Sequence, residues 1–435
     1  MALVSAMTLH AADIAETRSI MNARVDGGLA VGMVTGIIDA HGRQVFSAGK
    51  VTRGGTAAPD GDTVYEIGSI TKVFTSLLLA DMIEKGEVKP DDPVARFLPA
   101  KVKVPSRNGR QITLLDLSMQ VSGLPRLPDN LKPADPANPY ADYDAPKLYD
   151  FLSRYQLTRD PGEKYEYSNL AVGLLGHALA LKAGMPYEEL LRRRIFEPLG
   201  MSSTSITLSE DQKKRLAPGY DASLQPVKNW DLGVLAGAGA IRSTTNDMLK
   251  FVAANLELTD SPLRAAMRRM RSIKKDTGTP DLQIAMAWHI LTKFDQQIYW
   301  HNGGTGGYRS FMGFNPDTRQ GVVILCNTFT DNDDLGRHIL ESRYPVAAVR
   351  KEVQVDPAIL EHYVGEYQLT PAFKITVTRD GARLFVQATG QPRFEVFAQS
   401  ETEFFLKVVD AQITFEKDAL ILHQGGRDQK AGKTK

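Results

Sequence analysis

The first third of the chain changes from β-like to helical spacing of its apolar residues. Residues 31–49 form two β-rich runs on either side of Ala40-His41-Gly42, which predicts a hairpin. From Ser69 onwards the apolar residues recur at helical spacing instead: Val73, Phe74, Leu77, Leu78 and Met82. Gly86 ends this run, so the pattern predicts a helix that begins at Ser69 and is buried on most sides.

The middle of the chain predicts further helices and a second hairpin. Residues 116–123 and 170–183 have helical patterns. Residues 133–146 are rich in Pro, Asp and Ala, which is typical of an irregular surface loop. Residues 309–315 and 321–327 are β-rich and flank a Pro-Asp turn, so they predict a second hairpin.

After Arg350 the pattern becomes that of a small β module. Residues 373–378 alternate strictly between apolar and polar side chains, and four more short β-rich runs follow. A unit of roughly 80 residues is large enough to fold around its own core. The Lys- and Gly-containing end, residues 430–435, is expected to be unstructured.

Composition excludes several classes of protein. The 435 residues are 43% hydrophobic, which suffices for a sizeable core. The net charge of +1 gives no basic surplus for nucleic acid, and no Cys/His cluster suggests zinc. Cys326 is the single cysteine, so an intrachain disulfide is impossible and the compartment stays open.

The N-terminus suggests export. Ala2 to Leu9 is apolar and small, and an Ala-rich stretch follows, as at the end of a signal peptide, although the basic region is missing. We expect a periplasmic or secreted protein; the alternative is a mildly apolar first turn in a cytoplasmic one. No apolar run is long enough to span a membrane.

Ser-x-x-Lys occurs three times, as Ser47/Lys50, Ser69/Lys72 and Ser272/Lys275. Only Ser69 and Lys72 stand at the start of a buried helix, where residues three apart share a face. Burial and the positive end of the helix dipole lower the pKa of a lysine there, and such a lysine can act as a base towards the serine hydroxyl. The alternative is that Ser69 only caps the helix.

Two further segments carry chemistry. Tyr167-Ser168-Asn169 opens the helix at 170, and Tyr-x-Asn occurs once among 14 tyrosines. Tyr167 could transfer protons, and the Asn169 amide could hold Lys72 or a substrate carbonyl. The alternative is a core tyrosine with a capping asparagine.

The second segment is glycine-rich and follows Trp300. In it, Gly303, Gly304 and Thr305 could offer backbone N–H groups to an oxyanion or pair with a peptide-like substrate. His301 could bind or polarise a substrate. The alternative is a plain glycine-rich turn.

These three segments together resemble the motifs of the serine β-lactamase and penicillin-binding protein superfamily. Their order and spacing are similar to the class C β-lactamase branch and to family VIII carboxylesterases. Other segments that resemble this group are residues 114–125, 196–201 and 239–244. The resemblance covers about residues 15 to 345.

The resemblance implies an α/β (α+β) fold, with an antiparallel sheet flanked by helices and an all-helical subdomain. The last part resembles lipocalin-like modules of some relatives, which can lie beside the active site or simply stabilise the protein. We therefore expect a candidate signal-peptide remnant (1–12), a β-lactamase-like serine hydrolase domain (13–350) and a β-rich module (351–430).

The resemblance also implies a mechanism. Ser69 attacks a carbonyl to form an acyl-enzyme, Lys72 and Tyr167 exchange the protons in an order left open, and water releases the acyl group. The backbone N–H groups of Ser69 and of Thr305 or a neighbour form the oxyanion hole. No metal or organic cofactor is needed.

Two residues depart from the family pattern. His301 stands where the superfamily commonly has lysine, and it is only partly charged near neutral pH. Arg126 follows Gly-Leu-Pro, near where class C enzymes tend to have glutamine, and is a candidate for the missing positive charge.

We therefore expect a hydrolase of small carboxylic esters with some β-lactam activity. Alternatives are a class C-type β-lactamase, a D-Ala-D-Ala carboxypeptidase or D-amino-acid peptidase, and a β-lactam-binding sensor that is acylated without turnover. The substrate is a small ester, β-lactam or D-amino-acid peptide, and the oligomeric state stays open.

Overall fold

The computed structural model describes residues 11–350, 352–371 and 373–434. The candidate signal-peptide remnant, residues 1–12, lies outside this range except for its last two residues. These two residues begin the first helix, α1 (Ala11–Asp26). In the part of the chain that is described, no helix has the length and apolar character needed to cross a membrane.

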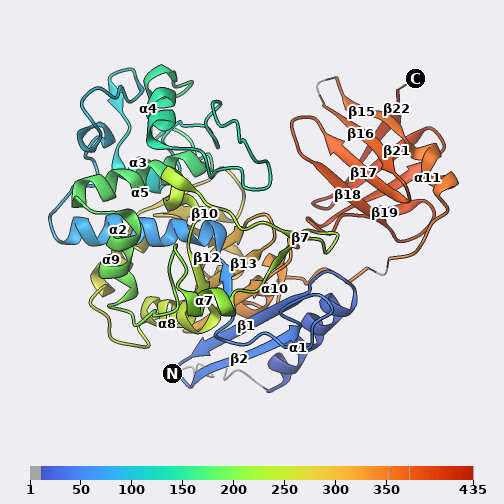
Figure 1. Cartoon of the computed structure of the whole chain (residues 1–435), viewed down its shortest axis with the longest axis horizontal. Helices are drawn as coiled ribbons and strands as arrows, with labels where there is room; N and C mark the ends of the chain where they lie inside the picture. The colour runs from blue at the N-terminus through green and yellow to red at the C-terminus, as the bar shows by residue number, and fades with distance from the viewer. Residues whose placement is uncertain (1–10, 351, 372, 435) are drawn as a thin grey trace.

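The body of the molecule is built on one antiparallel sheet of eight strands, in the order β2-β1-β14-β13-β12-β11-β10-β9 (Figure 1). The strands are β1 (Gly32–Asp39), β2 (Gly42–Gly49), β9 (Lys274–Asp276), β10 (Leu282–Ala285), β11 (Trp288–Leu291), β12 (Ile298–Gly304), β13 (Arg309–Asn315) and β14 (Gln320–Cys326). Both predicted hairpins are confirmed, as β1–β2 and β13–β14.

Helices cover both faces of the sheet, because its central strands are apolar on both sides. On β14, Val323 and Leu325 belong to the larger core, which includes α2 (Thr71–Glu84) and α8 (Thr245–Asn255). Val322 and Ile324 point to the other face and pack in the core formed with α1 and α10 (Asp333–Leu340). This burial on both sides fixes the register of the strands.

A helical subdomain packs against α2, which is buried from Thr71 to Met82 as its pattern predicts. The remaining helices are α3 (Leu114–Ser118), α4 (Ala145–Arg154), α5 (Asn169–Ala183), α6 (Tyr187–Leu191), α7 (Glu210–Arg215), α9 (Arg264–Ser272) and α11 (Pro357–Tyr363). Short elements complete the body: β3 (Val64–Glu66), β4 (Ser106–Arg107), β5 (Arg110–Gln111), β6 (Gly219–Tyr220), β7 (Pro226–Val227), β8 (Arg242–Thr244), η1 (Gly68–Ile70), η2 (Val94–Phe97), the π-helical η3 (Arg192–Phe196), η4 (Gly233–Ala238) and η5 (Lys293–Asp295).

The helix expected at 116–123 is wrong over most of its length. Thr113 forms a capping box with Asp116, so α3 begins earlier, at Leu114. It ends at Ser118, because Gln120 and Gly123 have φ angles of +59° and +80°, which a right-handed helix cannot accommodate.

The C-terminal part is a closed barrel of eight antiparallel strands that follow one another around it (Figure 1). They are β15 (Gly365–Thr370), β16 (Phe373–Asp380), β17 (Arg383–Ala388), β18 (Arg393–Ala398), β19 (Glu403–Phe405), β20 (Ala411–Glu416), β21 (Ala419–Gln424) and β22 (Arg427–Lys433). Side chains such as Phe404, Phe415 and Tyr367 form its core, together with Leu360 of α11.

The expectation of an unstructured end is wrong for residues 430–433, which belong to β22. Ala431 is fully buried and pairs with Leu420 of β21, while Tyr367 of β15 pairs with Lys433. Closing the barrel thus requires the last strand despite its polar sequence.

Candidate active site

Ser69 lies in the short 3₁₀ turn η1, just before α2. It caps neither helix: α2 has Ile70 as its N-cap, and neither helix has a side-chain cap hydrogen bond. Gly68 has a φ of +50°, and a Cβ there would lie 2.6 Å from the amide nitrogen of Gly304. Only glycine therefore fits at position 68 of this turn. The side chain of Ser69, the next residue, is partly exposed.

Lys72 is fully buried directly beside Ser69. Its Nζ lies 2.9 Å from Oγ of Ser69 and donates a hydrogen bond of 2.7 Å to the carbonyl of Ala238. Burial holds the pKa of Lys72 well below its usual value, and the charge of Arg126 lowers this pKa further. No carboxylate of the described residues forms an ion pair with Lys72, so nothing compensates its charge.

Tyr167 stands just before α5 and faces both of these groups. Ser168 is the N-cap of α5, with its Oγ accepting from the N–H of Ala171, so Asn169 does not cap this helix. The Tyr167 hydroxyl is hydrogen-bonded to Ser69, and its ring centroid is 4.8 Å from Nζ of Lys72. Burial raises the pKa of Tyr167, although the bond to Ser69 and the charge of Arg126 partly offset this.

Asn169, the first residue of α5, offers a free acceptor in the same pocket. Its Oδ1 is buried without a hydrogen-bond partner among the described residues, and the pocket it lines also contains Ser69. The hydrogen bonds of Lys72 go to Ser69 and Ala238 rather than to Asn169. The Oδ1 acceptor of Asn169 is therefore available to a substrate.

Strand β12 forms the opposite wall and is fixed to η1 by close backbone contact. A Cβ on Gly303 would lie 1.9 Å from the carbonyl oxygen of Ile67, which also accepts a hydrogen bond of 2.9 Å from Oγ of Ser310. The N–H of Thr305, which the sequence places first as an oxyanion donor, instead donates to the carbonyl of Tyr308 at 3.1 Å. Its neighbour Gly304 lines the pocket with Ser69 and is the better candidate.

His301 on β12 is buried and neutral. Burial, the neighbouring His289 and Lys72 together hold its pKa well below the usual histidine value. Its Nδ1 lies 2.6 Å from the carbonyl oxygen of Asn302. The partial positive charge expected at this position is therefore absent at neutral pH.

The sequence missed His289, which lies on β11 behind His301. The ring centroids of His289 and His301 are 5.0 Å apart. Burial lowers the pKa of His289 to about 4. Its Nε2 lies 3.0 Å from the hydroxyl of Tyr165. No motif surrounds His289, so only its place on the strand next to β12 reveals it.

The sequence also missed an aromatic wall over the pocket. The ring centroids of Tyr140 and Trp230 are 5.5 Å apart, and both residues line the pocket with Ser69. Tyr140 belongs to the loop expected at 133–146, which is irregular only as far as Asp144, because α4 begins at Ala145, and which buries Tyr140 and Tyr143. The cavity itself has a volume of about 20 Å³, little more than one water molecule needs.

Arg126 adds an exposed positive charge at this site. Its guanidinium carbon lies 5.0 Å from the ring centroid of Tyr167. Among the described residues it has no ion-pair partner, whereas Arg159 nearby in the sequence pairs with Glu166 at 2.6 Å. The charge is thus available to an anionic group.

Comparison with known proteins identifies the family of the chain. Residues 18–343 match the family model described as Beta-lactamase. The chain belongs to this β-lactamase family. Residues 349–420 match a second model, described as a domain of unknown function, DUF3471.

Individual relatives include peptidases and β-lactamases. The D-alanyl-D-alanine-carboxypeptidase/endopeptidase AmpH of Escherichia coli K12 is 30% identical over 312 residues, 69% of this chain and 80% of AmpH. Penicillin-binding protein 4* of Bacillus subtilis is 28% identical over 413 residues, 86% of this chain and 88% of the relative. A class C β-lactamase from Rhodobacter sphaeroides has a similar structure, with a TM-score of 0.65 and 25% identity over 77% of this chain and 99% of that one.

The contact between β12 and η1 gives a first prediction. In Gly303→Ala the new methyl group meets backbone at Ile67, which cannot move aside as a side chain can. The two segments must separate, and a shift of about 1 Å costs catalysis roughly a hundredfold. We expect kcat/KM for an activated ester to fall by roughly this factor. Gly432→Ala, at a site with open space, is the control; equal activity of the two variants would contradict the assignment.

Proposed function

We propose that the protein is a serine hydrolase that cleaves small carboxylic esters through an acyl-enzyme on Ser69, with additional activity on β-lactams. The observation that carries this proposal is the contact between Oγ of Ser69 and a buried, uncompensated lysine. The lowered pKa favours the neutral amine, which can take the proton of a serine hydroxyl.

The directions of the two pKa shifts support one order of proton transfers. The lowered pKa of Lys72 favours the neutral amine, and the raised pKa of Tyr167 favours the neutral phenol. Lys72 therefore accepts the hydroxyl proton of Ser69 as Ser69 attacks the carbonyl. Tyr167, which is hydrogen-bonded to Ser69, donates its own proton to the leaving group. The backbone N–H groups of Ser69 and Gly304 stabilise the oxyanion. Water then attacks the ester of Ser69 and gives a proton to the phenolate of Tyr167, and Lys72 returns its proton to the departing Ser69 oxygen, so all three groups regain their starting protonation states.

The surroundings favour small, uncharged substrates. His301 is neutral, so the wall of β12 provides no fixed cation for a carboxylate. Tyr140 and Trp230 leave little room beside Ser69, which favours short acyl groups. The apolar N-terminal stretch supports the further proposal that the enzyme acts in the periplasm or outside the cell.

A second candidate is a carboxypeptidase that acts on peptides ending in D-amino acids. Arg126 favours it, because its unpaired, exposed guanidinium could bind the terminal carboxylate of a peptide. AmpH, the relative described above, has this activity in its name. The positive charge of Arg126 would also attract the carboxylate of a β-lactam. This holds both for a β-lactamase, which hydrolyses the lactam, and for a sensor that is acylated without turnover.

A turnover panel tests the proposal. We expect kcat/KM to be highest for short-chain nitrophenyl esters, lower for nitrocefin and lowest for an acyl-D-Ala-D-Ala peptide. Ser69→Ala should lose roughly a thousandfold or more on all of them, since it removes the nucleophile. Activity that survives in Ser69→Ala would exclude the mechanism, a burst of nitrocefin without turnover would indicate a sensor, and a lead for the peptide would favour the carboxypeptidase.

The lowered pKa of Lys72 predicts the pH dependence of the same reaction. Only the neutral amine accepts a proton, so kcat/KM rises as pH rises through this pKa. Because that pKa is lowered, the rise should be complete well below about pH 10.4, the value for lysine in water. Initial rates on an ester across the pH range check this, and a rise centred at the ordinary lysine value would rule out Lys72 as the base.

Arg126→Gln separates the two candidate substrates. If Arg126 binds a carboxylate, the substitution should raise KM for the peptide roughly tenfold or more and leave KM for the neutral ester nearly unchanged, although loss of this charge raises the pKa of Lys72 for both substrates. Arg43→Gln, at an exposed position on β2, is the matched control. An equal effect of Arg126→Gln on ester and peptide would mean that the residue does not recognise the carboxylate.

A further inference from the structure

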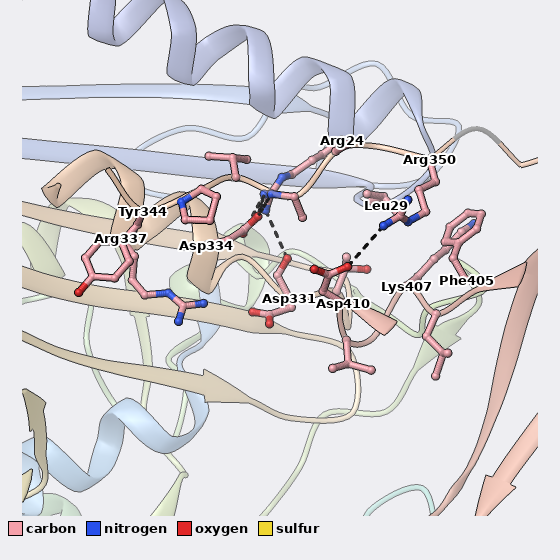
Figure 2. Close-up of a pocket in the computed structure, with 17 residues that line it drawn as sticks. Arg24, Leu29, Asp331, Asp334, Arg337, Tyr344, Arg350, Phe405, Lys407 and Asp410 are labelled. Carbon is pink, nitrogen blue, oxygen red and sulfur yellow. Dashed lines mark hydrogen bonds and ion pairs between the residues drawn. The ribbon is translucent and has the colours of Figure 1, made fainter. Parts of the chain in front are cut away.

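A second cavity lies between the body and the barrel and shares no residue with the pocket at Ser69 (Figure 2). Its volume is about 380 Å³, within the range of small-molecule sites. Arg24, Asp331 and Arg337 belong to the body, whereas Phe405 and Lys407 belong to the barrel. A ligand here would contact both parts.

Most of the charges around this cavity are already paired. Both carboxylate oxygens of Asp334 accept from Arg24, at 2.8 and 2.7 Å. The linker residue Arg350 lies 3.6 Å from Asp410 of the barrel. In the same way, Lys407 pairs with Glu352 at 3.0 Å.

Two opposite charges are left over on the body side, Arg337 and Asp331 (Figure 2). Among the described residues neither forms an ion pair, with each other or with any other group. Arg337 donates from Nε to the carbonyl of Asp333 at 3.1 Å, and its guanidinium carbon lies 5.9 Å from the ring centroid of Trp300, while its two terminal nitrogens have no hydrogen-bond partner among the described residues. One carboxylate oxygen of Asp331 accepts from the N–H of Asp333 at 2.9 Å, which leaves the other available.

We propose that this cavity binds a small dipolar molecule of the amino-acid type. Its carboxylate contacts Arg337, and its ammonium group contacts Asp331. A plain anion would leave the charge of Asp331 unfavourably close, and a plain cation would do the same for Arg337. A molecule with both charges satisfies the two residues together.

Calorimetric titration of the intact protein tests this site. We expect glycine, L-alanine or D-alanine to bind saturably, and propionate and ethylamine to bind roughly tenfold or more weakly, because each lacks one charged group. Arg337→Gln and Asp331→Asn should each weaken amino-acid binding by a similar factor while ester turnover stays unchanged. Arg43→Gln is the control.

Further variants keep the test decisive. Asp331→Asn, which preserves the shape of the side chain, replaces Arg337→Gln if that variant loses ester turnover through misfolding. Arg126→Gln should leave amino-acid binding unchanged, since that residue belongs to the pocket at Ser69. Absence of saturable binding, equal binding of propionate, full binding in Arg337→Gln, or loss of binding in Arg126→Gln would each overturn the proposal.

Discussion

The burial of Lys72 without a counter-charge is the constraint on which the site depends. A buried ammonium group costs so much free energy that the neutral amine is favoured instead. The fold keeps this amine in place by giving it two oxygen neighbours, Oγ of Ser69 and the carbonyl of Ala238. In the proposed mechanism, this arrangement places a base beside a nucleophile.

The rest of the body serves to hold three distant segments around that amine. The turn at Gly68 and the strand at Gly303 approach each other so closely that neither position has space for a Cβ. Ser168 fixes the start of α5 by capping it and by donating to the carbonyl of Pro125 at 2.6 Å. Tyr167 is therefore held in position by its neighbour Ser168. The sheet is rigid, so it holds the strand at Gly303 in a fixed position beside the site.

Local patterns in the sequence predicted the elements that depend on local spacing. The helix after Ser69, the helix ending at Ala183 and both hairpins follow from periodicity and turn residues. The missed features depend on contacts between distant segments. His289 acquires its role from strand pairing, Tyr140 from the folding of a loop over the pocket, and the last strand from closure of the barrel. The prediction of a helix at residues 116–123 failed for a different reason. The left-handed backbone at Gln120 prevents α3 from continuing, although the apolar pattern continues.

The most direct measurement of the central constraint is an NMR titration of the Lys72 side chain in the folded enzyme, with the signal assigned by its loss in Lys72→Arg. The structure predicts that this lysine loses its proton well below the pH at which the exposed lysines do. A Lys72 that titrates together with the exposed lysines would contradict the account, because it would be charged at neutral pH and could not accept the proton of Ser69.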